Sequence, residues 1–189
     1  MEPESLTVTI RHDACIRKEF RKRYQTPSFV VDYDAPIFDN IVKAIHAVYG
    51  NNPSLTELRD FTYEFISNKK SSLMFSFASV VARQKAGDCK AHAVFQTALA
   101  RKFGYNSKVV LGYVVVPLED NGWAVLGHAW SECFDQESGR WIGFDATKVR
   151  PTVDHAYIPI IEVEDEGPSY RTQLVKFIQH GVRRIEVVL

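Results

Sequence analysis

A cysteine at the start of an expected helix is the feature that most constrains this chain. Residues 87–104 read GDCKAHAVFQTALARKFG, in which apolar side chains recur at the three- and four-residue spacing of a helix. Asp88 can cap the N-terminus, and Gly104 can end the helix in a left-handed conformation. The sequence therefore predicts a helix that begins almost at Cys89. There the backbone N–H groups and the helix dipole favour the thiolate, which is the reactive form of a thiol.

Cys89 alone could instead be a small core residue, because buried free cysteines are common and usually inert. A nucleophile also needs a base, and the downstream sequence offers one. Residues 108–117 are a nearly continuous apolar, β-branched run, which is typical of a strand buried on both faces. Residues 123–134 and 140–144 are predicted to form two further strands joined by a polar turn that ends in glycine.

The register of this second hairpin places a histidine near an aspartate. If residues 135–138 form the loop, the residue opposite His128 is Asp145, and a loop longer by one residue would place Ala146 there. In either register an imidazole and a carboxylate lie on adjacent strands. Such a pair can deprotonate a thiol and hold the imidazole in the correct tautomer, so Cys89 gains a base and an orienting group.

Several motifs in this part of the chain resemble the core of the transglutaminase-like superfamily. They are GDC at 87–89, ARKFG at 100–104, VLGY at 110–113, GHAWSE at 127–132 and WIGFDAT at 141–147. Their joint occurrence in this order is a strong signal. The resemblance covers roughly residues 87–147.

The resemblance implies that Cys89 is the nucleophile, His128 the base and Asp145 the third member of a catalytic triad, which agrees with the hairpin argument. It also implies a papain-like α+β fold, in which the nucleophile helix packs on an antiparallel β-sheet. Members of the superfamily include cross-linking acyltransferases, cysteine peptidases and deglycosylating amidases, and all of them pass through a thioester.

The chain has 189 residues, of which 46% are hydrophobic, and this suits a single transglutaminase-like domain spanning residues 1–189. We expect the core motifs at 87–147, strands and helices at 1–86, and a helix-strand cover at 148–189. The expected N-terminal elements are strands at 6–10 and 29–33, a helix from Pro36 to Gly50 with Ile37, Ile41, Ile45 and Val48 on its apolar face, a helix capped by Ser54 or Thr56, and a partly helical bridge at 71–86. After the core we expect a strand ending near 161, a helix at 170–180 and a strand at 183–189.

The composition excludes several classes of partner. Lys and Arg together number 23, as do Asp and Glu, so there is no net charge to attract nucleic acid. The basic stretch at 17–23 is interpreted as a solvated face. No apolar run is long enough to span a bilayer and the start lacks a signal-peptide pattern, so we expect a cytoplasmic protein without a membrane partner.

Three cysteines, an odd number, indicate reduced thiols.

The functional hypothesis is a thiol-dependent hydrolase, either a cysteine peptidase or an amidase, that acts on a protein or peptide substrate without a cofactor. The alternative is a protein-glutamine acyltransferase with an amine acceptor. The chain has no room for the calcium sites and extra β-domains of the large animal transglutaminases, which favours the hydrolase. A non-catalytic binding module is a third possibility, against which the intact triad argues.

The same side chains allow two other interpretations. A zinc site could combine Cys89, His92, His128 and Cys133, but the last two are five residues apart on one strand and point to opposite faces, so no metal site is expected. His92 is also a rival base, although it lacks an obvious carboxylate partner.

Two residues are candidates for a role around the triad. Gln84 could donate to the oxyanion together with the Cys89 N–H, by analogy with papain-like enzymes, or it could be an ordinary exposed glutamine. Trp130 could wall the acyl channel, or it could be a core aromatic residue.

Overall fold

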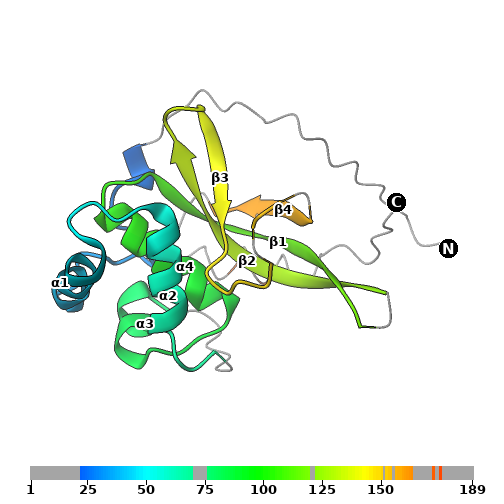
Figure 1. Cartoon of the computed structure of the whole chain (residues 1–189), viewed down its shortest axis with the longest axis horizontal. Coiled ribbons are helices and arrows are strands. Elements are labelled where there is room, and N and C mark those ends of the chain that lie inside the picture. The colour runs from blue at the N-terminus through cyan, green and yellow to red at the C-terminus, as the bar shows by residue number, and fades with distance from the viewer. Residues whose placement is uncertain are drawn as a thin grey trace.

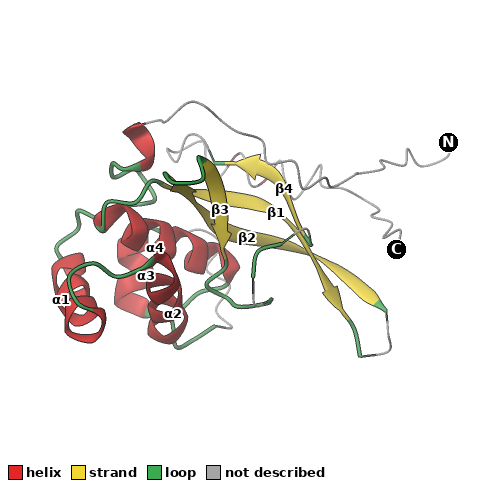
Figure 2. Ribbon diagram, turned by 45° about the horizontal axis from the view of Figure 1, so that its top comes forward, coloured by secondary structure: helices red, strands yellow, loops and turns green. Residues whose placement is uncertain are grey.

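The computed structural model describes residues 22–69, 76–119, 122–150, 152–154 and 156–163, together with Thr172 and Val175. Its elements in chain order are a short 3-10 helix η1 (Lys22–Tyr24), the helices α1 (Ile37–Tyr49), α2 (Leu55–Phe65), α3 (Ala78–Gln84) and α4 (Cys89–Lys102), and the strands β1 (Ser107–Pro117), β2 (Trp123–Asp135), β3 (Arg140–Phe144) and β4 (Tyr157–Glu162). The strands form one antiparallel sheet in the order β3-β2-β1-β4. Helices α1 to α4 gather on one side of this sheet (Figures 1 and 2), so the predicted α+β class is confirmed.

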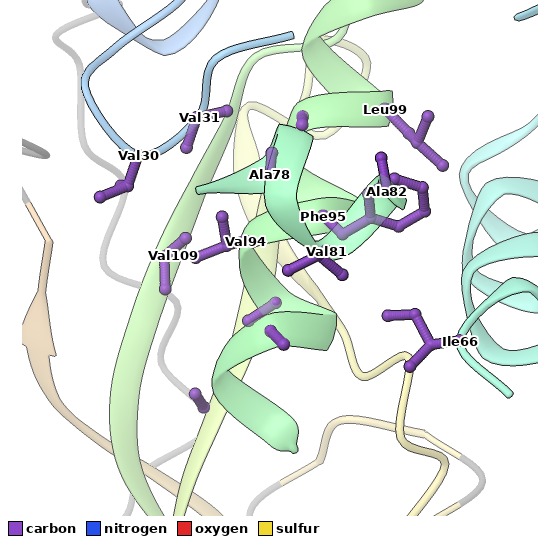
Figure 3. Packing of buried hydrophobic residues seen from close by; sticks show 14 of the residues in the cluster. Val30, Val31, Ile66, Ala78, Val81, Ala82, Val94, Phe95, Leu99 and Val109 are labelled. Carbon is purple, nitrogen blue, oxygen red and sulfur yellow. The ribbon is translucent and has the colours of Figure 1, made fainter. Parts of the chain in front are cut away.

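Helix α4 is the centre of the packing. It contacts α2 and α3 on one side and β1 and β2 on the other, and every residue from 91 to 101 is buried. Its Phe95 ring stacks on Phe65 at 5.0 Å between ring centroids. Figure 3 shows part of the surrounding core, contributed by Val30, Val31, Ile66, Ala78, Val81, Ala82, Val94, Phe95, Leu99 and Val109. A helix that is buried all round holds its first residue, Cys89, in a fixed place.

The other helices follow the sequence patterns with one exception. Ser54 caps α2 in a reciprocal capping box with Glu57, and α3 lies within the bridge that was predicted to be partly helical. In α1, Phe38 is fully buried whereas Val48 is 67% exposed, so the prediction of Val48 on the apolar face is wrong. The buried face runs through Phe38, Ile41 and Ile45 and ends one turn earlier.

The strand predicted at 29–33 is absent from the described part of the chain, where this segment is a loop. Val30 and Val31 are buried, but none of the strands in the described part of the chain pairs with them. Instead the Val30 carbonyl accepts a hydrogen bond from the Ala78 N–H at 2.8 Å, and Asp32 accepts one from the Ser79 N–H at 2.8 Å. The loop therefore holds the start of α3.

The hairpin of β2 and β3 is shifted by two residues from the predicted register. Asp135 pairs with Arg140, so the loop comprises residues 136–139 and not 135–138. The reason is local, because the Asp135 carboxylate accepts the N–H groups of Glu137 and Ser138 and starts the turn one residue later. The strand β3 ends at Phe144, directly before Asp145.

Gly112 allows the strands β1 and β4 to pack closely. Gly112 lies opposite His128 on β2, and the pairing of β1 with β4 changes register between Leu111 and Gly112. A Cβ at this position would overlap the carbonyl oxygen of Ile158 and lie 2.8 Å from the Trp130 ring. Only glycine allows β4 to approach β1 this closely.

The remaining predicted elements lie outside the described residues. These are the strand at 6–10, most of the basic stretch at 17–23, the strand at 183–189 and, apart from Thr172 and Val175, the helix at 170–180. Among the described residues, no helix is long and apolar enough to cross a membrane.

We expect Gly112→Ala to lower the free energy of unfolding by about 1–3 kcal/mol, because β4 must move to admit the methyl group. Urea denaturation measures the loss, and hydrogen exchange should show weakened protection of the β4 amides. Gly104→Ala is the control, because Gly104 has a φ of 85° with nothing near its Cβ position, and its variant strains only the local backbone. Full protection of β4 in Gly112→Ala would contradict the packing argument.

Candidate active site

Cys89 is the first residue of α4, as the sequence predicted. Asp88 caps the helix by accepting the Lys90 N–H at 3.0 Å, and its carboxylate also pairs with the Lys90 ammonium group. Gly87 has a φ of 152°, and a Cβ there would overlap the side chain of Ala91. The Gly-Asp-Cys motif therefore makes the tight turn that starts the helix at a half-buried cysteine.

His128 and Asp145 form a buried pair beside this cysteine. The Nε2 atom of His128 lies 2.9 Å from Oδ2 of Asp145, and the two residues are 6% and 4% exposed. Cys89 lies beside the same imidazole, since its side chain is one of the groups that raise the pKa of His128. The structure thus brings together the three residues that the sequence singled out.

The surroundings of His128 favour its charged form. Burial alone would lower its pKa, but the hydrogen bond with Asp145, the contact with Cys89 and the charges of both raise the pKa to about 9. Burial would raise the pKa of Asp145. The hydrogen bond and the charge of His128, together with the two hydrogen bonds from Thr147, outweigh burial and hold this pKa below its ordinary value. Both shifts stabilise an imidazolium-carboxylate pair.

Asp145 accepts four hydrogen bonds, which satisfy both of its oxygens. Thr147 donates its N–H at 2.8 Å and its hydroxyl at 2.7 Å to Oδ1, and the Tyr157 hydroxyl donates to Oδ2 at 2.8 Å beside His128. Burial and the charge of Asp145 raise the pKa of Tyr157, so the phenol stays a neutral donor. The carboxylate is therefore ionised and held in one orientation.

Tyr157 is the site residue that the sequence did not indicate. It opens β4 and pairs with Val114 of β1, so its place depends on a strand pairing between segments far apart in the chain. Thr147, in contrast, lies inside a recognised motif, although no role was predicted for it. The Trp-x-x-x-Asp-x-Thr pattern is the signal that could have identified it.

Trp130 lies behind the imidazole. Its ring stacks near that of His128 at 6.3 Å and meets the Tyr157 ring edge-on at 5.3 Å. At 1% exposure it belongs to a buried cluster with Val110 and Val114, which favours the core-aromatic interpretation over a channel wall. The ring packs against the side chains of both His128 and Tyr157.

Gln84 ends α3 with an exposed side chain. Among the hydrogen bonds of the described residues, none joins it to Cys89. This placement favours the interpretation as an ordinary exposed glutamine, and an oxyanion role for Gln84 stays a prediction.

His92 is a buried neutral residue one turn after the cysteine. Its Nδ1 lies 2.8 Å from the Asp88 carbonyl oxygen, which can only accept, so Nδ1 carries the proton. Burial lowers the His92 pKa, and the charge of Lys69 lowers it further. A neutral imidazole bound to its own helix is less suited than His128 to take a proton from Cys89.

Cys133 is a core thiol. It is fully buried, it lies 3.3 Å from the Ser107 hydroxyl, and burial raises its pKa to about 12. In the described part of the chain, no three His, Cys, Asp or Glu side chains are grouped as ligands for a metal ion.

The pKa of His128 makes stability depend on pH. Below pH 6.5, the ordinary pKa of histidine, the imidazole is charged in both the folded and the unfolded chain, and the ion pair contributes its full stabilisation. This stabilisation is lost as the pH rises through about 9, where the folded imidazole loses its proton. We expect the difference in free energy of unfolding between wild type and His128→Gln, up to about 3 kcal/mol, to shrink across this window. Urea denaturation between about pH 5.5 and 10 measures it, and a constant difference would contradict the pair.

We expect Tyr157→Phe to lower the free energy of unfolding by about 1–3 kcal/mol, because the buried Asp145 carboxylate loses a donor. Tyr49→Phe is the matched control, since Tyr49 packs against the core from α1 without such a bond. Equal losses in the two variants, measured by thermal or urea denaturation, would show that the Tyr157 hydroxyl contributes nothing specific.

The chain was compared with curated proteins and with solved structures. No curated protein sequence matches it. A protein of Cytophaga hutchinsonii provisionally named a cysteine protease is similar in structure, with a TM-score of 0.55 and 20% identity over 76% of this chain and 48% of that one. The periplasmic domain of TgpA from Pseudomonas aeruginosa gives a TM-score of 0.43 and 15% identity over 68% and 49%. The chain therefore spans about half the length of either protein, and the first likeness shows a shared fold.

The sequence profile of one family also matches the chain. The match to the transglutaminase-like superfamily covers residues 41–146, which is more than half of the chain and includes Cys89, His128 and Asp145. The protein belongs to the transglutaminase-like superfamily, whose members are usually cysteine-dependent enzymes.

Proposed function

We propose that this protein is a thiol-dependent hydrolase, a cysteine peptidase or amidase, that cleaves an amide bond of a protein or peptide through a thioester on Cys89. The observation that carries the proposal is the buried, fully hydrogen-bonded pair of His128 and Asp145 beside a cysteine at a helix N-terminus. This is the arrangement that a nucleophile, its base and an orienting group require.

Acylation begins with attack of the Cys89 sulfur on the carbonyl carbon of the amide. His128 holds the thiol proton, because its raised pKa favours the imidazolium, and the developing oxyanion faces the backbone N–H of Cys89 at the start of α4. His128 then gives its proton to the leaving amine as the C–N bond breaks. The amine departs and the acyl group remains on sulfur as a thioester.

Deacylation reverses these roles. His128 takes a proton from water, the resulting hydroxide attacks the thioester carbonyl, and the C–S bond breaks to release a carboxylic acid and restore the thiol. Asp145 keeps its negative charge throughout and holds the imidazole, since its four hydrogen bonds favour the ionised form. An amine in place of water would give the acyltransferase reaction from the same thioester.

We expect Cys89→Ala and His128→Ala to abolish activity. Asp145→Asn should leave a small residual rate, about 10⁴-fold below wild type, because the imidazole loses its correct tautomer. A screen of protein and glutamine-containing peptide substrates measures activity as new N-termini or released ammonia, and added alkylamine shows whether an amine replaces water. Full activity of Cys89→Ala on a verified substrate would disprove the proposal.

Cys89 reactivity tests the nucleophile before any substrate is known. At about pH 7 we expect iodoacetamide to modify Cys89 at least about tenfold faster in wild type than in His128→Ala, because the imidazole stabilises the thiolate. Peptide mass analysis separates Cys89 from Cys15 and from Cys133, the buried thiol that serves as the internal control. Equal rates in the two proteins would favour the binding-module interpretation.

A further inference from the structure

Two lysine side chains from different segments meet on one tyrosine ring of α2. The ammonium of Lys69 lies 4.1 Å and that of Lys148 lies 4.5 Å from the centroid of the Tyr63 ring. Lys69 follows α2, whereas Lys148 follows β3, so the fold and not the local sequence brings these charges together. Tyr63, Lys69 and Lys148 are called the Tyr63 cluster below.

Lys69 is attached to the turn that precedes the nucleophile. Its neighbour Asn68 forms a β-bridge with Ala86 and accepts the N–H of Gly87 at 3.0 Å, two residues before Cys89. The charge of Lys69 also acts on His92 of α4, because it adds to the effect of burial in lowering the pKa of His92.

Lys148 is attached to the other half of the site. It directly follows Thr147, which donates two hydrogen bonds to Asp145, and its own N–H donates to the Asp145 carbonyl at 3.3 Å. The Tyr63 cluster therefore joins the segment beside Cys89 to the segment that holds the base.

The charges of this cluster are only partly neutralised. Asp60 lies 3.1 Å from the Lys148 ammonium, but it also accepts from Arg59 at 2.9 Å and so serves two cations. Lys69 donates to the Ile66 carbonyl at 3.1 Å, and none of the carboxylates in the described part of the chain forms an ion pair with it. Both lysines keep exposed surface, so an incoming anion can reach them.

We propose that the Tyr63 cluster binds a carboxylate of the substrate close to the amide that Cys89 attacks. The two ammonium groups would pair with the carboxylate, and the Tyr63 ring would keep both of them in place. This inference rests on the proposed function, because it assumes that the acyl group is delivered to Cys89.

Two alkylating reagents of nearly equal size but different charge test the proposal. Iodoacetate carries a carboxylate, whereas iodoacetamide is neutral. The rate of Cys89 alkylation by iodoacetate divided by the rate with iodoacetamide therefore measures how strongly the site attracts an anion. Any change in the reactivity of the thiol itself affects both rates and cancels in this ratio. We expect Lys69→Gln and Lys148→Gln each to lower this ratio about two- to fivefold, and the double variant to lower it about tenfold. About 1 M salt should remove most of the difference.

Charge-preserving and remote variants control the experiment. Lys69→Arg and Lys148→Arg should keep the wild-type ratio, and Lys43→Gln on the exposed side of α1 should leave both rates unchanged. An unchanged ratio in the double variant would overturn the carboxylate site while leaving the proposed function standing. Equal iodoacetamide rates at Cys89 in wild type and in His128→Ala would instead contradict the proposed function.

Protection of Cys89 from iodoacetamide identifies the source of the carboxylate. N-acetylglutamate α-amide offers a side-chain carboxylate, N-acetylglutamine offers a terminal one, and N-acetylglutamine amide is the neutral control. We expect one of the two acids to protect Cys89 at a lower concentration than the neutral compound does. The acid that protects better shows whether the bound carboxylate is a side-chain or a terminal one. If neither protects better than the neutral compound, the proposal is wrong.

Discussion

The structure depends on one buried carboxylate. Asp145 lies at the end of β3 and is satisfied by donors from three segments, namely β2, the turn after β3 and β4. An ionised carboxylate without such donors would be too costly to bury, so these segments must meet at one point for the fold to form. The contacts that make burial of this carboxylate possible also hold the His128 imidazole in one orientation.

The two halves of the site are positioned by different means. Cys89 depends on packing, because α4 is enclosed by helices on one side and strands on the other and cannot shift without disturbing the core. His128 depends on directional bonds, since its imidazole is held between Asp145 and the ring of Trp130. A reaction that moves a proton between sulfur and imidazole benefits when neither partner has to be reordered.

The sequence predicted that Cys89, His128 and Asp145 lie together because each is in or beside a strongly patterned segment. The hairpin register was wrong by two residues, yet such a shift keeps every side chain on its face, so the pairing of His128 with Asp145 survived the error. Tyr157 could not be found in this way, because its position depends on the pairing of a six-residue strand with β1 far along the chain. The segment at 29–33 shows the opposite failure, since two buried valines fit a loop as well as a strand.

Lys108 shows how the far strand β4 is coupled to the rest of the sheet. Its buried ammonium on β1 lies 3.1 Å from Glu132 of β2, 2.8 Å from Glu162 of β4 and 4.3 Å from the centroid of the Trp141 ring. If β4 detached, a buried cation would lose one of its two carboxylates, so partial opening of the sheet is penalised at a point remote from the site. Lys108 thus makes the folding of β4 cooperative with that of β1 and β2, and the Tyr157 hydroxyl reaches Asp145 as part of that single transition.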